Sequence, residues 1–394
     1  MGWSTRNLTT DFSAPRAFLG PAAYLFKSQS TRHVIYLGAD ASGNSTGILY
    51  EGYCGTDDVW HFKNLMNEAQ GASPAISSAA PTAYAFEAEQ TQHVLYRAGD
   101  NHIHELYWNG SWNHNDLTNN TGAPEISGQA YGWEFVTGGR QQVVFMGVDN
   151  LVHLLTRGYS GNPQWQHQAL TKAGDPLCAG SPGGYPFETG RSQHVNYRSD
   201  DLGDQRLYEI VQDPNTGKWG TPIEMGKGLT GVPQVIDDQH RGFADEASGI
   251  RYVDFLGDDY NIYEYSFIGS WKLTSLTKSC VPPAPLAYAG YRPAPYMFPS
   301  TSAVPTATQH SIYIGTDQIQ ELWRYAGQTW NENALSGVMR DMLLNSPSAF
   351  VDTTASTQNV FFATSAGAIM ELRWKVGDTV VFHPPGGDKR KRRS

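Results

Sequence analysis

The chain has 394 residues, a formal net charge of −10 and a pI near 5.6, and 12% of its residues are aromatic. Such an acidic chain lacks the basic face that neutralises phosphates, which excludes nucleic acid as its main partner. The abundance of Gly, Tyr and Trp favours sheets and turns over long helices, and no apolar run is long enough to insert into a membrane.

The first predicted element is a strand that starts at Trp3, ends near Leu8-Thr9 and is followed by Ala14-Pro15. After it, the chain repeats a unit of four short strands separated by tight turns. The clearest copy has predicted strands at 84–86, 92–96 and 103–108 and a fourth that starts at Trp112. Turn signals such as Gly99-Asp100-Asn101 separate these strands.

Units of this kind recur at intervals of about fifty residues, which is typical of β-propellers. We count seven, and their first recognisable segments begin at the following residues: Tyr24, Tyr84, Trp133, Tyr185, Tyr252, Tyr296 and Phe350. The sequence therefore predicts an all-β fold, a seven-bladed β-propeller of four-stranded antiparallel blades.

The last unit has no obvious fourth strand of its own, whereas the N-terminal segment from Trp3 matches the segment from Trp112. We expect the N-terminal strand to complete the last blade and close the ring, which leaves no bare sheet edge. Residues 379–382 are a competing closure strand. Residues 1–385 are predicted to form one domain, and 386–394 a basic disordered tail whose alternatives are a nuclear-localisation signal, a tag for anionic surfaces or an appended remnant.

The three cysteines, Cys54, Cys178 and Cys280, are far apart in the sequence. Neither a disulfide framework nor a metal site is predicted from them, and no cofactor is expected. The N-terminus lacks the apolar segment of a signal peptide, so the chain is expected to be cytoplasmic or secreted by a non-classical route.

Catalytic signatures are poor, and no catalytic residue is assigned. Acid pairs at 237–238 and 258–259 fit turns, where Asp bonds to the local backbone. Whether the protein is an enzyme is left open, with a binding protein favoured.

A polar set recurs within the units. His93, Glu105 and Trp108 have the same spacing as Asn359, Glu371 and Trp374. Four more units keep the acid, and three of them keep the histidine: Glu51, Glu209, Glu264 and Glu321, with His33, His194 and His310. In the third unit Leu154 replaces the acid.

A charge repeated inside an apolar strand costs free energy unless it has a partner. One partner is a sugar, whose hydroxyls bond to a carboxylate and whose C–H face stacks on an indole. The other is His93 itself, which would bridge to Glu105 on the neighbouring strand as a structural pair. Glu105 and Trp108 are three residues apart, so a regular strand points them to opposite faces. The three residues His93, Glu105 and Trp108 form the best complete candidate site only if the strand ends or bends near Leu106; otherwise Trp108 serves a neighbouring site. The tryptophans at the start of the fourth strands are interpreted as packing anchors between blades: Trp112, Trp165, Trp219, Trp271 and Trp330.

The pattern Val94-x-Tyr96, Asp100, Ile103-x-Glu105, Trp108 and Trp112 resembles the repeat of the fungal fucose-binding propeller lectins. The resemblance implies sugar sites between neighbouring blades, each with an arginine, a glutamate and an aromatic residue. Carried over, the glutamate falls on Glu105 and Glu371, and by extension on Glu51, Glu209, Glu264 and Glu321. The aromatic falls on Trp108 and Trp374. The arginine position holds His33, His93, His194 and His310, and Asn359 in the last unit. The number of blades differs as well, since the fungal lectins have six and this sequence predicts seven.

The leading hypothesis is a multivalent lectin for a neutral sugar such as fucose, with glycans as partners; a homo-oligomer is also compatible with the sequence. The first alternative is a polysaccharide lyase or glycoside hydrolase whose unique site would lie where the repeats diverge, at 200–206 and 237–248. The second alternative is a protein-interaction scaffold.

Overall fold

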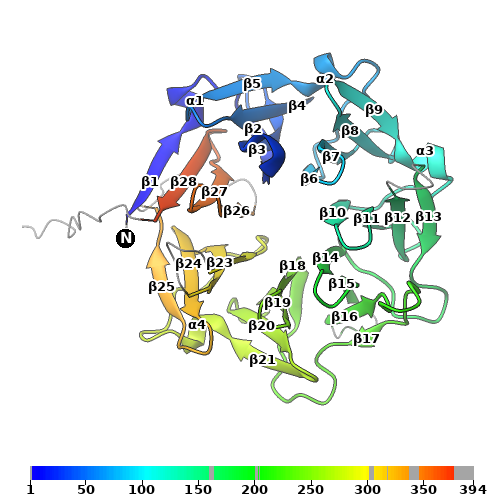
Figure 1. Ribbon diagram of the computed structural model, residues 1–394, viewed down its shortest axis with the longest axis vertical. Helices are drawn as coiled ribbons and strands as arrows, with labels where there is room; N and C mark the ends of the chain where they lie inside the picture. Colours follow the sequence, from blue (N-terminus) through cyan, green and yellow to red (C-terminus); the bar gives the residue numbers. More distant parts are fainter. Residues whose placement is uncertain are drawn as a thin grey trace, which may run out of the picture.

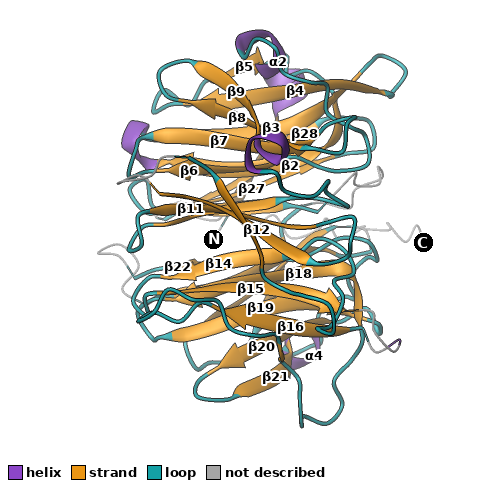
Figure 2. Ribbon diagram, turned by 90° about the vertical axis from the view of Figure 1, so that its right-hand side faces the viewer, coloured by secondary structure: helices purple, strands orange, loops and turns teal. Residues whose placement is uncertain are grey.

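The computed structural model describes residues 2–158, 164–199, 203, 205–300, 306–316, 318–336 and 346–376. Within them, seven four-stranded antiparallel sheets form a closed ring (Figure 1). Seen edge-on, the strands cross the thickness of the ring (Figure 2). The seven-bladed propeller expected from the repeat is confirmed. The competing closure segment 379–382 and the basic tail 386–394 lie outside the described residues.

Six of the blades run from an inner strand to an outer one in chain order, whereas the outer strand of the seventh is the first strand of the chain (Figure 1). Blade I consists of β2 (Ala17–Phe26), β3 (Thr31–Ala39), β4 (Ser45–Cys54) and β5 (Trp60–Asn64). Blade II consists of β6 (Thr82–Phe86), β7 (Thr91–Arg97), β8 (Ile103–Trp108) and β9 (Trp112–Asp116). Blade III consists of β10 (Tyr131–Phe135), β11 (Arg140–Met146), β12 (Val152–Gly158) and β13 (Gln166–Ala169).

Blade IV consists of β14 (Gly183–Phe187), β15 (Ser192–Ser199), β16 (Arg206–Val211) and β17 (Ile223–Glu224). Blade V consists of β18 (Val235–Asp245), β19 (Ile250–Gly257), β20 (Ile262–Phe267) and β21 (Trp271–Ser275). Blade VI consists of β22 (Ala294–Phe298), β23 (Thr308–Ile314), β24 (Ile319–Tyr325) and β25 (Asn331–Ala334). Blade VII consists of β26 (Ser348–Asp352), β27 (Thr357–Ala363), β28 (Ile369–Lys375) and β1 (Trp3–Asn7).

The N-terminal strand closes the ring, as predicted. β1 pairs antiparallel with β28, so that Trp3 lies opposite Trp374 and Arg6 opposite Glu371. Blade VII therefore contains both ends of the described chain, and its outer edge is formed by the first strand (Figure 1).

One-turn helices follow four of the outer strands: α1 (Leu8–Asp11), α2 (Leu65–Glu68), α3 (Leu117–Thr121) and α4 (Leu276–Ser279). Asn7, Asn64 and Asp116 cap three of them by accepting hydrogen bonds from backbone N–H groups of the first turn. A short 3-10 helix, η1 (Lys27–Gln29), lies between β2 and β3. Among the described residues, no helix has the length and apolar character needed to cross a membrane.

The hydrophobic core lies between blades, because every apolar cluster combines side chains from two neighbouring sheets. Inner strands contact each other through an aromatic ring and a glycine. A Cβ atom added at Gly132 would lie 2.3 Å from the Tyr84 ring, and one at Gly184 would lie 2.3 Å from the Trp133 ring. The absence of a side chain at these glycines is what allows the rings of the preceding blade to pack there.

Glutamates also join consecutive blades at their hairpins. The Glu188 carboxylate of blade IV accepts hydrogen bonds from the backbone N–H groups of Val136 and Thr137 in blade III, both at 2.8 Å. Glu246 of blade V does the same for Glu188 and Thr189, at 2.9 and 2.8 Å. These repeated contacts fix the spacing of the blades and hence of the side chains between them.

Candidate functional site

The recurring histidine and glutamate of each unit form a buried pair on adjacent strands of one blade. In blade II, His93 Nδ1 lies 2.8 Å from Glu105 Oε1, and His93 Nε2 lies 2.7 Å from the Thr91 hydroxyl. The same geometry recurs for three more histidine–glutamate pairs: His33 and Glu51, His194 and Glu209, and His310 and Glu321. All eight side chains are at least nine-tenths buried. The structural pair considered as an alternative role for these residues is therefore present, and each histidine supports its glutamate from within the blade.

Glu105 and Trp108 lie at two different blade interfaces, so the structure does not group them in one site. Glu105 faces blade III, where its Oε2 atom accepts a hydrogen bond from Trp165 Nε1 at 3.3 Å. Trp108 faces blade I and packs edge-on against Phe26, with ring centroids 6.2 Å apart. Trp374 likewise packs against Phe298 of the preceding blade, at 6.0 Å. The alternation of side chains along a strand requires this separation.

Two of the glutamates are contacted instead by a tryptophan of the following blade that lies at or just before the start of its outer strand. Trp165 contacts Glu105 across interface II/III, the boundary between blades II and III. Trp60 Nε1 donates to Glu371 Oε2 at 3.2 Å across interface VII/I. Trp165, one of the tryptophans expected to be packing anchors, thus also brings an indole N–H to a buried acid.

Arginines from the following blade complete this arrangement. At interface IV/V, Arg251 Nη1 lies 2.7 Å from Glu209 Oε1, and its guanidinium carbon is 4.2 Å above the Phe267 ring and 5.4 Å from that of Trp271. His194 Nδ1 lies 2.6 Å from Arg251 Nη1, and the Tyr185 hydroxyl donates a hydrogen bond to Glu209 Oε1 at 3.2 Å.

Interface V/VI also combines an arginine, a glutamate and a tryptophan, but its arginine lies on the third strand of the following blade, whereas Arg251 lies on the second. Arg324 Nη2 lies 3.1 Å from Glu264 Oε1, and its guanidinium carbon lies 4.5 Å from the Trp330 ring. Gln309 bonds to both members of the ion pair. Glu264 has Tyr252 in place of the histidine of other blades.

At interface II/III, Arg157 is the corresponding cation. Its Nη1 atom lies 3.0 Å from Glu89 Oε2, and its charge acts on the nearby Glu105 carboxylate. Asn115 Nδ2 donates to Glu105 Oε2 at 2.8 Å. Arg157 is the most exposed of the four arginines that flank a buried glutamate from the following blade, since 23% of its side chain is exposed, against 18% for Arg324, 9% for Arg251 and 6% for Arg32.

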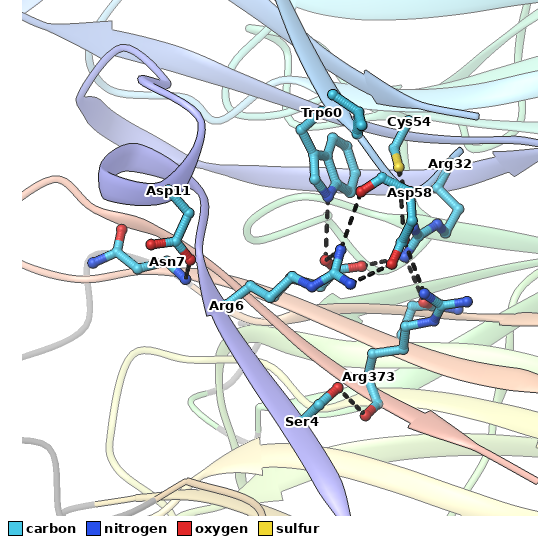
Figure 3. A network of polar contacts seen from close by, with 12 residues as sticks. Ser4, Arg6, Asn7, Asp11, Arg32, Cys54, Asp58, Trp60 and Arg373 are labelled. Atoms are coloured by element: carbon cyan, nitrogen blue, oxygen red, sulfur yellow. Dashed lines mark hydrogen bonds and ion pairs between the residues drawn. The ribbon is translucent and has the colours of Figure 1, made fainter. Parts of the chain in front are cut away.

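Interface VII/I, where the ring closes, holds the densest network of charges (Figure 3). Arg32 of blade I pairs with Glu371 of blade VII and with Asp58. Arg6 on β1 and Arg373 on β28 also converge on Asp58. Asn359, the residue in place of the usual histidine, receives a 3.5 Å hydrogen bond from Arg32.

The remaining three interfaces have no arginine at either of the two positions that supply it elsewhere. Interface III/IV has Leu154 where the acid would be, and a neutral bridge of 2.7 Å runs from Gln193 to Gln212. At interfaces I/II and VI/VII, Gln92 and Gln358 accept hydrogen bonds from tyrosines of the preceding blade. The seven interfaces are therefore repeats of one geometry with different chemistry.

The environment favours the ionised form of two of these acids, Glu105 and Glu209. Burial alone would raise the pKa of Glu105, but the hydrogen bond and charge of His93, with Asn115 and Arg157, hold that pKa below its usual value. Burial acts the same way on Glu209, whose pKa is lowered by His194 and Arg251. Glu264 differs, because burial raises its pKa to about 7 despite Arg324 and Gln309.

The four arginines were missed in the sequence, where the histidines were placed at the arginine position. Arg32 and Arg251 are second residues of their blades' second strands, whereas Arg157 and Arg324 lie near the ends of third strands. No single spacing from the glutamate finds them. The one available signal was the recurrence of arginine at two positions that flank the histidine–glutamate pair.

The irregular stretches where the enzyme alternative would place its site are described in part. Residues 200–202 and 204 lie outside the described residues. In the second stretch, the Arg241 guanidinium lies 4.0 Å from the Tyr131 ring. Together with Arg292, Arg241 lines a cavity of about 190 Å³ between the inner strands.

No protein-family model matches the sequence, and no curated protein matches it. Solved structures do match. BP39L lectin from Burkholderia pseudomallei is 12% identical with a TM-score of 0.66, and the match covers 93% of this chain and 98% of that one. AofleA from Arthrobotrys oligospora is 12% identical with a TM-score of 0.51, covering 76% and 84%. SapL1 lectin, solved in complex with α-methyl fucoside, is 16% identical with a TM-score of 0.51, covering 75% and 92%. The expected resemblance to propeller lectins is thus confirmed at the level of the fold, which in this chain has seven blades.

Proposed function

We propose that the protein is a lectin that binds a neutral sugar, fucose or a related hexose, at several of its blade interfaces. The observation that carries the proposal is the recurring arrangement of an arginine, a glutamate and a tryptophan around one interface. A guanidinium donates hydrogen bonds to sugar hydroxyls and a carboxylate accepts them. An indole offers the flat apolar surface on which the C–H face of a sugar packs.

Interface II/III is the best candidate for a working site. Its arginine is the most exposed of those compared, Trp165 is half-buried, and Glu89 and Asn115 add further polar groups. The solved complex of SapL1 lectin with α-methyl fucoside, a protein of the same fold, favours fucose as the first sugar to test. Several such sites on one rigid ring would raise the overall affinity for a surface that displays many sugars.

The proposal is tested with a glycan array and with calorimetric titration of the sugar that the array identifies. Arg157→Ala removes the guanidinium but leaves the buried pair of His93 and Glu105 in place. We expect affinity at that site to fall about tenfold or more, as for the loss of a charged hydrogen bond. Arg140→Ala removes an exposed arginine of the same blade and is the matched control, with affinity expected to stay unchanged.

A second variant copies into blade II the two residues of blade III, the blade that has no glutamate at this position. His93→Gln with Glu105→Leu installs in blade II the residues that blade III has as Gln142 and Leu154. The number of sugar molecules bound per chain should fall by one, with the folded structure retained in circular dichroism. A folded protein that binds no glycan would refute the lectin proposal. Binding that both variants leave intact would show that sugars bind elsewhere on the ring.

A further inference from the structure

A second group of polar side chains lies in blade II, on the faces of β8 and β9 that point away from Glu105. Asp100 is in the turn before β8, His102 directly precedes that strand, His104 is its second residue, and Asp116 ends β9. One ligand atom from each of these four residues lies within 4.8 Å of all the others. His104 directly precedes Glu105, so the two side chains leave opposite faces of the strand.

The distances within this group are close to those of a metal site. His102 Nδ1 lies 2.8 Å from Asp116 Oδ2 and 3.8 Å from Asp100 Oδ2, and His104 Nε2 lies 3.1 Å from Asp100 Oδ2. The ligand atoms of a tetrahedral zinc ion with bonds of about 2.0–2.2 Å are roughly 3.3–3.6 Å apart. Shifts of less than about 1 Å would bring this set to that geometry.

The backbone and neighbouring side chains already fix three of the four ligands. Asp100 accepts a hydrogen bond from the His102 N–H at 3.0 Å, and Asp116 Oδ1 accepts one from the Asn119 N–H at 2.9 Å. His104 Nδ1 lies 2.8 Å from His114 Nε2, the kind of outer partner that orients metal-binding imidazoles. His104 is buried, whereas 44% of the Asp100 side chain is exposed, so an ion has a route from solvent.

Blade III has counterparts of Asp100, His104 and His114 but none of His102 and Asp116. Asp149, His153 and His167 form the same hydrogen-bonded series, with His153 Nε2 3.0 Å from Asp149 and His153 Nδ1 3.0 Å from His167. Leu151 and Ala169 stand where blade II has His102 and Asp116. The repeat therefore accounts for Asp100, His104 and His114, and blade II adds two metal-binding side chains beside them.

Blade V shows that this corner of a blade accommodates a cation. There Asp259 and Tyr263 take the places of Asp100 and His104, and the Tyr263 hydroxyl lies 2.8 Å from Asp259. The Lys278 ammonium bonds to both, at 2.8 Å to Asp259 and 3.3 Å to Tyr263. In blade V a side chain thus supplies a positive charge at the corner.

We propose that Asp100, His102, His104 and Asp116 bind one divalent transition-metal ion, with Zn²⁺ as the preferred ion. Two imidazoles and two carboxylates in a tetrahedral arrangement suit zinc better than Ca²⁺ or Mg²⁺, which take oxygen ligands. The bound ion ties the turn before β8 to the end of β9 and stabilises blade II. This site is separate from the proposed sugar-binding interfaces, and its test does not use a glycan.

The test uses the full chain without a polyhistidine tag, freed of metal with EDTA. Calorimetric titration with Zn²⁺ should show one ion bound per chain, and Co²⁺ should give the intense visible absorption of a tetrahedral complex. His102→Leu with Asp116→Asn is the informative variant. It uses the leucine of blade III and keeps a helix cap, since asparagine caps α1 and α2. We expect its affinity for Zn²⁺ to fall at least about 100-fold.

The matched control is His153→Tyr in blade III, which uses the residue of blade V and should leave zinc binding unchanged. Thermal unfolding with and without Zn²⁺ gives a second measurement, because an ion that binds the folded state raises the melting temperature of the wild type and not of the double variant. The proposal is overturned if the wild type binds no Zn²⁺, if the double variant binds it as well as the wild type, or if His153→Tyr is the change that abolishes binding.

Discussion

Two acids face each other in the interior of blade V. Asp254 lies opposite Glu264 in the strand register, and both are 1% exposed or less. The residue opposite the glutamate is Ile35 in blade I, Leu95 in blade II and Ile312 in blade VI. Burial, together with the charge of Glu264, raises the pKa of Asp254 well above its usual value. Blade V therefore contains an acidic pair where blades I, II and VI have an apolar residue opposite the glutamate and blade IV has Asn196.

This pair predicts that stability falls as pH rises. Glu264 has a pKa of about 7 in the folded protein, above its ordinary 4.5, so the folded state keeps a proton that the unfolded state releases. Its contribution is fully present below the unfolded pKa and is lost as pH rises through about 7. Asp254→Ile should raise the free energy of unfolding at pH 8 by about 1–4 kcal/mol and flatten the dependence on pH.

Urea unfolding between pH 5 and pH 8 measures both effects. The reciprocal variant Ile312→Asp places a carboxyl opposite Glu321 in blade VI and should make the pH dependence steeper. An Asp254→Ile protein with the same pH dependence as the wild type would contradict this account.

At the scale of the strand, the contact between inner strands sets how closely blades approach. Tyr84 of β6 packs on Gly132 of β10, and a Cβ atom there would lie 2.3 Å from the ring and 2.7 Å from Leu95. Both neighbours are buried, and the Tyr84 hydroxyl is held by Gln141 at 3.0 Å. Neither Tyr84 nor Leu95 can therefore move aside without disrupting the packing between blades II and III.

Gly132→Ala should consequently lower the free energy of unfolding by about 1–3 kcal/mol, the usual cost of overpacking. Thermal or urea unfolding measures the change. Gly99→Ala is the control, since no heavy atom lies within 4 Å of its added Cβ, and its stability should stay near that of the wild type. Equal losses in the two variants would mean that the effect comes from backbone freedom instead of contact with Tyr84.

The strands could be predicted from the sequence, and the contacts between blades could not. Alternating apolar runs, turn residues and a repeated order of segments identify the elements and their number, because these signals are local. The arginines beside Glu105, Glu209, Glu264 and Glu371 come from the next repeat and from two different strand positions. Which side chain faces a neighbouring blade depends on the twist and packing of whole sheets, and the spacing of residues in one repeat does not record it. The separation of Trp108 from Glu105 was the exception, since strand alternation alone indicates it.

At the scale of the whole molecule, stability depends on closing the ring. β1 covers the edge of β28, and Arg6 brings a charge from the first strand to Asp58 and Glu371 of the closing interface (Figure 3). Without β1, the N–H and C=O groups on one side of β28 would be unpaired, and bare edges of this kind associate with other chains.

Deletion of residues 1–7 should therefore lower the unfolding free energy by several kcal/mol, on the order of half the stability of a typical domain. It should also cause self-association. Urea unfolding and size-exclusion chromatography measure the two effects. Ser4→Ala, which removes only the exposed 3.0 Å side-chain bond to Arg373, is the control. A truncated chain that stayed monomeric and as stable as the wild type would show that closure by β1 is dispensable.

Closure by the first strand has a consequence for the protein during its synthesis. Ser4 and Arg373, which bond to each other, are 369 residues apart in the chain. At translation rates of about 5–20 residues per second, the first strand leaves the ribosome roughly 20–75 s before its partner exists. Six blades can assemble in that interval while the segment that completes the seventh stays unpaired and exposed to chaperones and proteases. The order of synthesis thus makes blade VII the last sheet to be completed, and β1 is the strand that waits longest for its partner.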